Sequence, residues 1–535
     1  MTATSQSLQH GAAGPRAAAA GGSTRLGECV AKLTAHLVTH IDDRGAVQEA
    51  CGSRVLESAL MLALLRRERI YPGTRKSLAR FLQSQREDRA LTALERQLAD
   101  ICLSDRPPQV EVEALLGGFE HFTAARKRLM FDTYLMVLGA TPPDEKVNLS
   151  AVEYHGHASW VGVTLSAVKI LHAYGRGRPD LLREQDREFL TSQVEDGSRR
   201  EVWEGHLSAH LLALHAVNRF LPGSRLVRED IDRILQHRNP DGGLPFITDM
   251  TVWLTALAGL ALTRVDTDPA LLRRMGDYLA IHQAPDGGWS YTESVTQTDV
   301  DDTSCSAEFL SALDPSRYAD ELNRAGRYLT HIANEDGGFP TYRRGHASEI
   351  TMTANAISAL APDWDRHAAL LEPAVAFLLR TQKPDGTFER SWSRADAYAI
   401  SRALHALSLA PHRHVARFRT GISQVSTLAL RYLEGAQNPD GGWGHRSGDP
   451  SDPISTAHAL TASLPSGSAP WRLSGVRYLM DQQEPDGGFT SVPDQAAPRP
   501  IPYDFPVLAD IFVLKALGNT HHLLSQGAHP TERTS

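Results

Sequence analysis

The sequence predicts an all-α protein assembled from repeated pairs of helices. An Asp-Gly turn signal recurs seven times, and its Asp residues lie 45, 45, 50, 49, 55 and 46 residues apart. Between the turns lie stretches rich in Ala and Leu, with apolar residues at positions i, i+3 and i+4. Alternation of β-branched and polar residues, which is typical of strands, is scarce. Helices are expected at residues 54–66, 159–174, 206–220, 251–263, 303–313, 354–360 and 401–409.

A near-constant period of this size indicates stacked supersecondary units. In the Pro-Asp-Gly-Gly form of the turn, Pro restricts φ, Asp bonds to its own backbone and Gly supplies a positive φ. A glutamine precedes several of the turns, at Gln283, Gln382, Gln437 and Gln483. Two architectures fit this pattern. The units stack into an open solenoid, or about six of them close into a barrel of inner and outer helices around an apolar hollow.

The length of 535 residues exceeds one typical domain core, so two domains are expected. The turns become regular after about residue 235, which places a first helical domain at 25–235 and a second at 236–522. Residues 1–24 are rich in Ala, Gly, Ser and Gln and lack the apolar core of a signal peptide, so a disordered leader is expected. Residues 523–535 are expected to form a disordered tail.

The composition is that of an ordinary globular protein, with 41% apolar and 22% charged residues. A formal charge of −8 and a pI near 6.3 argue against a general nucleic-acid binder. The four cysteines are sparse and show no CxxC spacing, so a reducing cytoplasm is the expected compartment. The longest dense apolar run, residues 56–65, is shorter than the roughly 20 residues that cross a bilayer.

Asp299, Asp301 and Asp302 place three carboxylates within four residues. Their mutual repulsion in a dry site raises at least one pKa, and a carboxylic acid that stays neutral can donate its proton. The start of the helix expected at 303–313 opposes this effect, because a helix N-terminus favours ionised acids. Helix capping or binding of Ca²⁺ or Mg²⁺ would also account for such a cluster.

The Asp-Val-Asp-Asp-Thr stretch at 299–303 resembles the DxDD(T) motif of class II terpene cyclases. The turns at 283–289, 437–443 and 483–489 are similar to the QW repeats of the same superfamily. The resemblance covers roughly residues 235–520 well and the earlier half more loosely. It implies two α-barrel domains, called β and γ, with the DxDD motif on the β domain, the active site between the two, and no class I α domain.

The resemblance implies that Asp301 is the general acid and that Asp299 and Asp302 tune and orient it. Protonation of a terminal alkene creates a tertiary carbocation, and the remaining double bonds then close rings until a base removes a proton. The hollow must be dry, since water would quench the cation. Aromatic faces that line it would stabilise positive charge by about 1–2 kcal/mol each.

Several aromatic residues are candidates for that lining. Trp392 and Tyr398 are the main ones, and Trp160 and Trp253 are further candidates. Trp289 lies in a turn and is expected to pack mainly against its helix, but it is kept as a candidate substrate contact.

The sequence contains neither the DDxxD motif nor the second metal motif with which class I cyclases ionise a diphosphate. A diphosphate on the substrate should therefore remain on the product. Arg390 and Arg394, in a stretch that resembles the Lys-Trp-His segment of diterpene cyclases, are candidates to hold it. Diphosphate usually travels with Mg²⁺, and Glu153 is the candidate ligand. Glu153 and His155 are also candidate terminating bases.

The resemblance is strongest to bacterial βγ cyclases, including those that convert farnesyl diphosphate to drimenyl diphosphate. Geranylgeranyl diphosphate, giving a copalyl-type product, is the alternative substrate, and a squalene-type triterpene cyclase is a further alternative. A protein prenyltransferase subunit would need Zn²⁺ held by Asp, Cys and His. A helical repeat protein that binds a partner on its concave face is the non-enzymatic alternative. The oligomeric state stays open.

Overall fold

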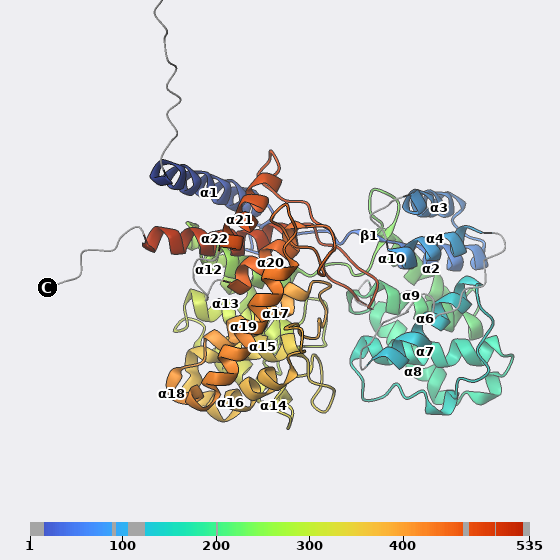
Figure 1. Ribbon diagram of the computed structural model, residues 1–535. Helices are drawn as coiled ribbons and strands as arrows, with labels where there is room; N and C mark the ends of the chain where they lie inside the picture. Colours follow the sequence, from blue (N-terminus) through green and yellow to red (C-terminus); the bar gives the residue numbers. More distant parts are fainter. Residues whose placement is uncertain are drawn as a thin grey trace, which may run out of the picture.

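The computed structural model describes residues 15–87, 92–104, 123–198, 202–463, 470–497 and 499–527. Its helices form two bodies that lie side by side (Figure 1). Each body has its own cluster of buried apolar side chains. The two-body, all-α architecture predicted from the sequence is therefore confirmed.

The larger body is a closed barrel of paired helices. Its inner ring consists of α11 (Thr251–Leu262), α13 (Val300–Leu313), α15 (Ile350–Leu360), α17 (Asp396–Ser408), α20 (Pro453–Ser463) and α22 (Val507–Gly527). The outer helices are α12 (Pro269–Ile281), α14 (Ala319–Ile332), α16 (Trp364–Thr381), α19 (Arg419–Ala436), α21 (Pro470–Gln482) and α1 (Pro15–Val38). Each inner helix packs against the next, and α22 packs against α11. The ring is thus closed, and the open solenoid is excluded.

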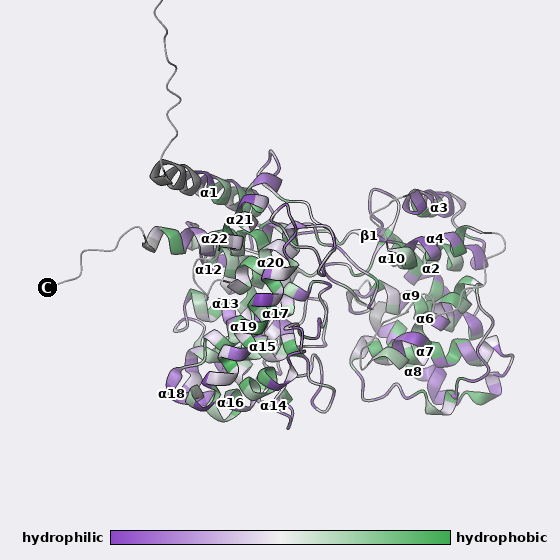
Figure 2. Ribbon diagram, viewed as in Figure 1, coloured by the Kyte–Doolittle hydropathy of each residue, from purple (hydrophilic) through white to green (hydrophobic). Residues whose placement is uncertain are grey.

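Burial explains why the two rings differ in composition. Every residue of α11 and of α15 is buried, which requires a helix that is apolar or small on all sides. On the outer helix α14 only Ala325, Gly326, Leu329 and Ile332 are buried. Outer helices such as α14 and α16 accordingly carry both hydrophilic and hydrophobic residues (Figure 2). The short helix α18 (His412–Val415) precedes α19.

The repeated turns connect neighbouring units of the barrel. Nε2 of Gln283 donates to the carbonyl of Gly287 in its own turn, at 2.8 Å, and to that of Glu321 on the next outer helix, at 3.0 Å. Gln382 and Gln437 make the same pair of bonds in their own units. Gly287 has a φ of +93°, and a Cβ there would lie 2.6 Å from the Arg324 carbonyl oxygen. The turn therefore needs glycine both for its conformation and for its close approach to the next helix.

Helix α1 is the outer helix that pairs with α22, and it thereby completes the outer ring of the barrel. Gln483 donates to the Cys29 carbonyl on α1 at 3.0 Å, as Gln283 does to α14. The buried apolar residues of 26–51 accordingly belong to the barrel cluster, so their assignment to the first domain was wrong. The predicted termini also need correction, because residues 15–24 and 523–527 are helical. Residues 1–14 and 528–535 lie outside the described residues.

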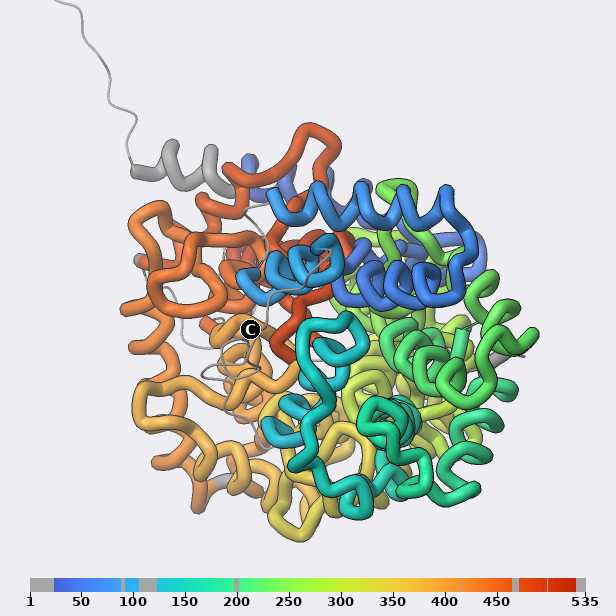
Figure 3. Tube along the Cα trace, turned by 90° about the vertical axis from the view of Figure 1, so that its right-hand side faces the viewer, coloured from blue at the N-terminus to red at the C-terminus, as the bar shows by residue number. Residues whose placement is uncertain are grey.

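The smaller body has a cluster formed by residues 55–234 together with Leu244 and Ile501. Its helices are α2 (Val55–Glu68), α3 (Pro72–Glu87), α4 (Ala93–Leu103), α6 (Ala124–Leu138), α7 (Ser159–Gly175), α8 (Glu184–Ser198), α9 (Leu207–Phe220) and α10 (Arg225–Gln236). Seen from its side, this body lies in front of the barrel (Figure 3). The antiparallel strands β1 (Ser53–Arg54) and β2 (Leu244–Pro245) pair where the chain passes from one body to the other. Among the described helices, none has the length and apolar character needed to cross a membrane.

Candidate active site

A cavity lies between the two bodies, at the N-terminal end of α13. Both bodies contribute to its walls, and aromatic side chains form much of them. The lining residues are Trp160, His206, Phe246, Ile247, Met250, Trp253, Tyr291, Asp299, Asp301, Asp302, Thr341, Tyr342, Trp392, Gln495, Ala497 and Tyr503. All three predicted acids thus reach one largely apolar cavity.

The start of α13 orders the acids. Asp299 is the N-cap, and its Oδ1 accepts a hydrogen bond from the backbone N–H of Asp302 at 2.8 Å. Asp299 and Asp302 are buried, whereas Asp301 is half-buried. Oδ1 of Asp301 accepts a 2.6 Å bond from Asn355 Nδ2 and lies 3.6 Å from the Cys305 thiol. Asp301 is therefore held in place while its carboxyl group remains accessible from the cavity.

Burial dominates the titration of the cluster. It raises the pKa of Asp301, although Arg402 and the hydrogen bond from Asn355 oppose the rise. Burial raises the pKa of Asp299 to about 7, and burial together with the neighbouring Asp299 raises that of Asp302 well above its usual value. Desolvation thus raises the pKa values of these acids more than the helix N-terminus lowers them, a balance that the sequence alone could not decide. The cavity holds carboxylic acids that can stay protonated near neutral pH.

Aromatic rings surround these acids. The predicted Trp392 lines the cavity, and so do the further candidates Trp160 and Trp253. Four further aromatic residues that were not predicted also line the cavity: Phe246, Tyr291, Tyr342 and Tyr503. A local signal exists for two of them. Phe246 and Tyr291 each stand three residues after the second glycine of a turn, and Thr341, at the equivalent place in the next turn, also lines the cavity.

A second, basic cavity adjoins the first. It shares Trp160, Thr341, Tyr342 and Trp392 with the acid cavity. Its cationic and imidazole side chains are Arg126, Lys127, His157, His346 and Arg499. The two cavities therefore place an acid and a set of positive charges on either side of a common aromatic wall.

The basic groups of this second cavity are only partly compensated by acids, because Arg499 pairs with Glu389 and Glu349. Lys127 is only 5% exposed, and burial, with Arg126 and Arg499 nearby, lowers its pKa well below the usual value. Nε of Arg126 is buried and has no hydrogen-bond partner among the described residues. Arg499 lies over the Trp392 ring at 5.4 Å and pairs with Glu389 at 3.0 Å. Such a pocket favours a polyanion that accepts several hydrogen bonds.

Sequence comparison identifies the family. The squalene-hopene cyclase C-terminal domain matches residues 347–522, and the prenyltransferase alpha-alpha toroid domain matches residues 211–362. The chain is 42% identical to a drimenyl diphosphate synthase of Streptantibioticus cattleyicolor, over 96% of this chain and 98% of the relative. This chain belongs to the class II terpene cyclases. A drimenyl diphosphate synthase of Streptomyces showdoensis is also 42% identical, over 93% of the cyclase described here and 95% of its own length.

A solved structure agrees with this fold. The ent-copalyl diphosphate synthase of Streptomyces platensis superposes with a TM-score of 0.56 at 15% identity. The match covers 93% of the cyclase and 99% of the solved chain. At this identity the likeness shows the shared fold alone.

Two aromatic residues predicted to contact substrate lie outside the acid cavity of the cyclase. Trp289 is fully buried, and its Nε1 donates to the Leu279 carbonyl at 2.8 Å, so it packs beneath its turn. Tyr398, on α17, faces a different cavity and packs against His458 and Phe512. Neither side chain reaches the acid cavity, and Trp289 packs in the way that was mainly expected. The aromatic character was visible in the sequence, but the direction of the side chain depends on packing.

The predicted diphosphate and metal ligands also lie elsewhere. Arg394 Nη1 donates to the Pro493 carbonyl at 3.0 Å, and Arg390 Nη1 donates to the Arg394 carbonyl at 3.1 Å. Neither arginine lines the acid cavity or the basic one. Glu153 and His155 are exposed and also line neither, which removes the structural basis for their roles as metal ligand and base.

Proposed function

We propose that this cyclase converts farnesyl diphosphate into drimenyl diphosphate and retains the diphosphate on the product. The two relatives of 42% identity carry that activity in their names. The observation that carries the proposal is the shared wall between the acid cavity and the basic cavity. It allows one linear molecule to offer its alkene to Asp301 while its phosphates remain among the cations.

The reaction begins with proton transfer from the Asp301 carboxyl group to the terminal alkene. The two electrons of that double bond form the new C–H bond, which leaves a tertiary cation. The next double bonds attack in turn, and loss of one proton restores an alkene, so substrate and product are isomers. The faces of Trp160, Trp253 and Trp392 stabilise the charge as it moves, and the apolar walls keep water away from it.

The diphosphate is assigned to the basic cavity. Arg126, Lys127 and Arg499 offer several N–H donors, and His157 and His346 lie beside them. The unpaired Nε of Arg126 gains a partner when an anion enters. These residues replace Arg390 and Arg394 in the proposal.

We propose that Mg²⁺ enters bound to the substrate diphosphate and is not held by protein carboxylates. Among the described residues lining the basic cavity, Glu349 is the one carboxylate, and it already contacts Thr341, Ser391 and Arg499. This donor set does not fit a Mg²⁺ ion held by protein carboxylates. Turnover after EDTA treatment, with and without added Mg²⁺, tests whether the substrate needs the ion.

The expected compartment is the cytoplasm, and the four cysteines support it. Cys29, Cys51, Cys102 and Cys305 are all free and buried. A reducing environment preserves thiols in this state.

The test uses the purified full-length protein and linear C15 and C20 prenyl diphosphates. We expect a cyclic C15 diphosphate, identified as its alcohol after phosphatase treatment. Asp301→Asn should lower kcat by at least about a hundredfold, because the acid cannot be replaced by an amide. Asp314→Asn makes the same change at the exposed end of α13 and should retain activity. Turnover unchanged by Asp301→Asn would refute the assignment, and exclusive use of the C20 substrate would support the copalyl-type alternative.

A further inference from the structure

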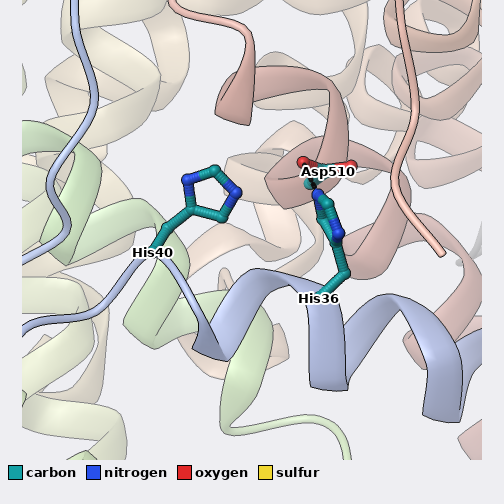
Figure 4. Close-up of side chains that lie close together, drawn as sticks. All are labelled: His36, His40 and Asp510. Atoms are coloured by element: carbon teal, nitrogen blue, oxygen red, sulfur yellow. Dashed lines mark ion pairs between the residues drawn. The ribbon is translucent and has the colours of Figure 1, made fainter. Parts of the chain in front are cut away.

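We propose that His36, His40 and Asp510 form a binding site for a divalent transition metal ion, best suited to Zn²⁺, that fastens α1 to α22. The first two residues belong to the last turn of α1 and the residues just after it, and Asp510 lies on α22 (Figure 4). Each offers one ligand atom, and these atoms all lie within 4.8 Å of one another. No residue of the cluster lines the acid cavity or the basic cavity.

One distance within the cluster is close to that of a bound metal, and the remaining ligand atoms lie within 4.8 Å. In a tetrahedral site with bonds of about 2.0–2.1 Å, neighbouring ligand atoms lie about 3.3 Å apart. His36 Nε2 and Asp510 Oδ2 are 3.6 Å apart, so a shift of a few tenths of an ångström would bring this pair to the separation found around a metal ion. The rings of His36 and His40 lie close together, with their centroids 5.3 Å apart.

Each ligand has a second partner that leaves one atom available. Glu49 Oε2 lies 3.2 Å from His40 Nδ1, which leaves Nε2 of that ring for the metal. Asp486 Oδ2 lies 3.9 Å from His36 Nδ1. The N–H of Phe489 donates to Asp510 Oδ1 at 2.8 Å, which leaves Oδ2. A carboxylate or backbone partner behind each ligand is the usual arrangement around protein metal ions.

The turn beside the cluster leaves room on the metal-facing side. A Cβ on Gly488 would lie 2.6 Å from His36 Nε2. The side chains of His36 and His40 are 21% and 26% exposed, so an ion and a completing water can reach them. Two imidazoles and one carboxylate suit Zn²⁺ better than Mg²⁺, which prefers oxygen ligands.

The position suggests a structural role for the ion. Helix α1 is the outer helix that completes the barrel, and it comes from the opposite end of the chain to α22. An ion shared by the two would bind the folded ring and not the unfolded chain, so it would stabilise the ring. Because the site is separate from both cavities, removal of the ion should leave turnover at low temperature unchanged.

The test uses untagged full-length protein, stripped with EDTA and then desalted. Calorimetric titration with ZnCl₂ should show one ion per chain, and Tm should rise with Zn²⁺ concentration. Co²⁺ should give the visible absorption of a tetrahedral site. His40→Gln and Asp510→Asn should each remove the rise in Tm. His282→Gln is the matched control, because His282 has 22% exposure and one nearby acid, Glu293 at 3.5 Å, but is in no cluster of three possible ligands among the described residues.

Three results would overturn the proposal. The first is no uptake of Zn²⁺ by the stripped protein. The second is equal uptake by wild type and His40→Gln, which would place the ion elsewhere. The third is a rise in Tm that His282→Gln removes as effectively as His40→Gln. If His40→Gln does not fold, the Co²⁺ spectrum of the wild-type protein decides, since a spectrum without tetrahedral bands contradicts the site.

Discussion

Asn355 donates from Nδ2 to Oδ1 of Asp301 at 2.6 Å, and Arg402 determines which end of the amide faces the acid. Arg402 Nε donates to Asn355 Oδ1 at 2.5 Å, and Arg402 also pairs with Glu308 at 3.0 Å. Since an arginine can only donate, the amide oxygen must face it, and the NH₂ group must face Asp301. Oδ1 of Asp301 is therefore an acceptor, and the transferable proton resides on Oδ2.

Replacement of Asn355 should lower kcat while leaving KM nearly unchanged. Asn355→Leu removes the donor that orients Asp301, and a hydrogen bond to a group that becomes charged contributes about 1.5–3 kcal/mol. We expect kcat to fall by about tenfold to a hundredfold, with little change in KM, in steady-state assays. Ser358→Ala, on the same helix, removes only a bond to the Ala354 carbonyl and should retain near-normal kcat.

The pH profile should report the protonation of Asp301. Only the protonated acid is active, so kcat/KM should decline as the pH rises through its raised pKa. The Asn355 bond stabilises the carboxylate and so lowers that pKa. Asn355→Leu should therefore move the alkaline limb to higher pH, although the maximal rate is lower. A limb that stays in place in the variant would mean that another group controls it.

Stability should depend on pH through Asp299. Its pKa rises from 3.8 in the unfolded chain to about 7 in the folded protein, so the folded state binds the proton more tightly. The contribution of Asp299 to the free energy of unfolding is fully present below about pH 4. It is lost as the pH rises to about 7, at a rate of at most about 1.4 kcal/mol per pH unit. Asp299→Asn keeps the helix cap but cannot ionise. Its Tm relative to wild type should rise between these pH values, and Asp268→Asn at the exposed cap of α12 should show a smaller trend.

Loss of charge in the basic cavity should weaken the grip on the diphosphate. Lys127→Met removes a buried amine that has Arg126 and Arg499 nearby and that a bound diphosphate would favour in its charged form. We expect kcat/KM for the diphosphate substrate to fall about tenfold or more, while turnover of the neutral alcohol analogue changes little. Arg390→Met, at a half-buried arginine outside both cavities, should stay within about twofold of wild type.

The contact between α1 and the turn at 483–489 should be sensitive to replacement of Gln483. Gln483→Ala removes bonds of 3.0 Å to the Cys29 carbonyl and 2.9 Å to the Gly487 carbonyl. We expect a loss of about 1–2 kcal/mol in the free energy of unfolding by urea and faster hydrogen exchange in α1. Gln482→Ala, at the exposed neighbouring residue, is the control. Equal effects of the two changes would show that the bonds of Gln483 do not stabilise the contact between α1 and this turn.

The parts of the site that could be predicted are those encoded by contiguous residues. Asp299, Asp301 and Asp302 form one short stretch, and the N-cap and first turn of α13 bring all three to the cavity. The basic cavity could not be predicted, since Lys127, His346 and Arg499 lie more than 150 residues from one another in the sequence. Arg390 and Arg394 lie in the stretch that resembles the Lys-Trp-His segment of diterpene cyclases. Their side chains nevertheless bond to backbone carbonyls, that of Arg390 to Arg394 and that of Arg394 to Pro493.

By itself, the sequence determined the helical class, the repeating turns and the identity of the acid cluster. These depend on local chemistry: the period of apolar residues, the conformations open to Pro, Asp and Gly, and the repulsion between adjacent carboxylates. Tertiary structure decided that the ring closes, that α1 completes it, and which aromatic and basic side chains face the substrate. Those outcomes depend on contacts between distant segments, because a side chain's direction and burial are set by what packs around it.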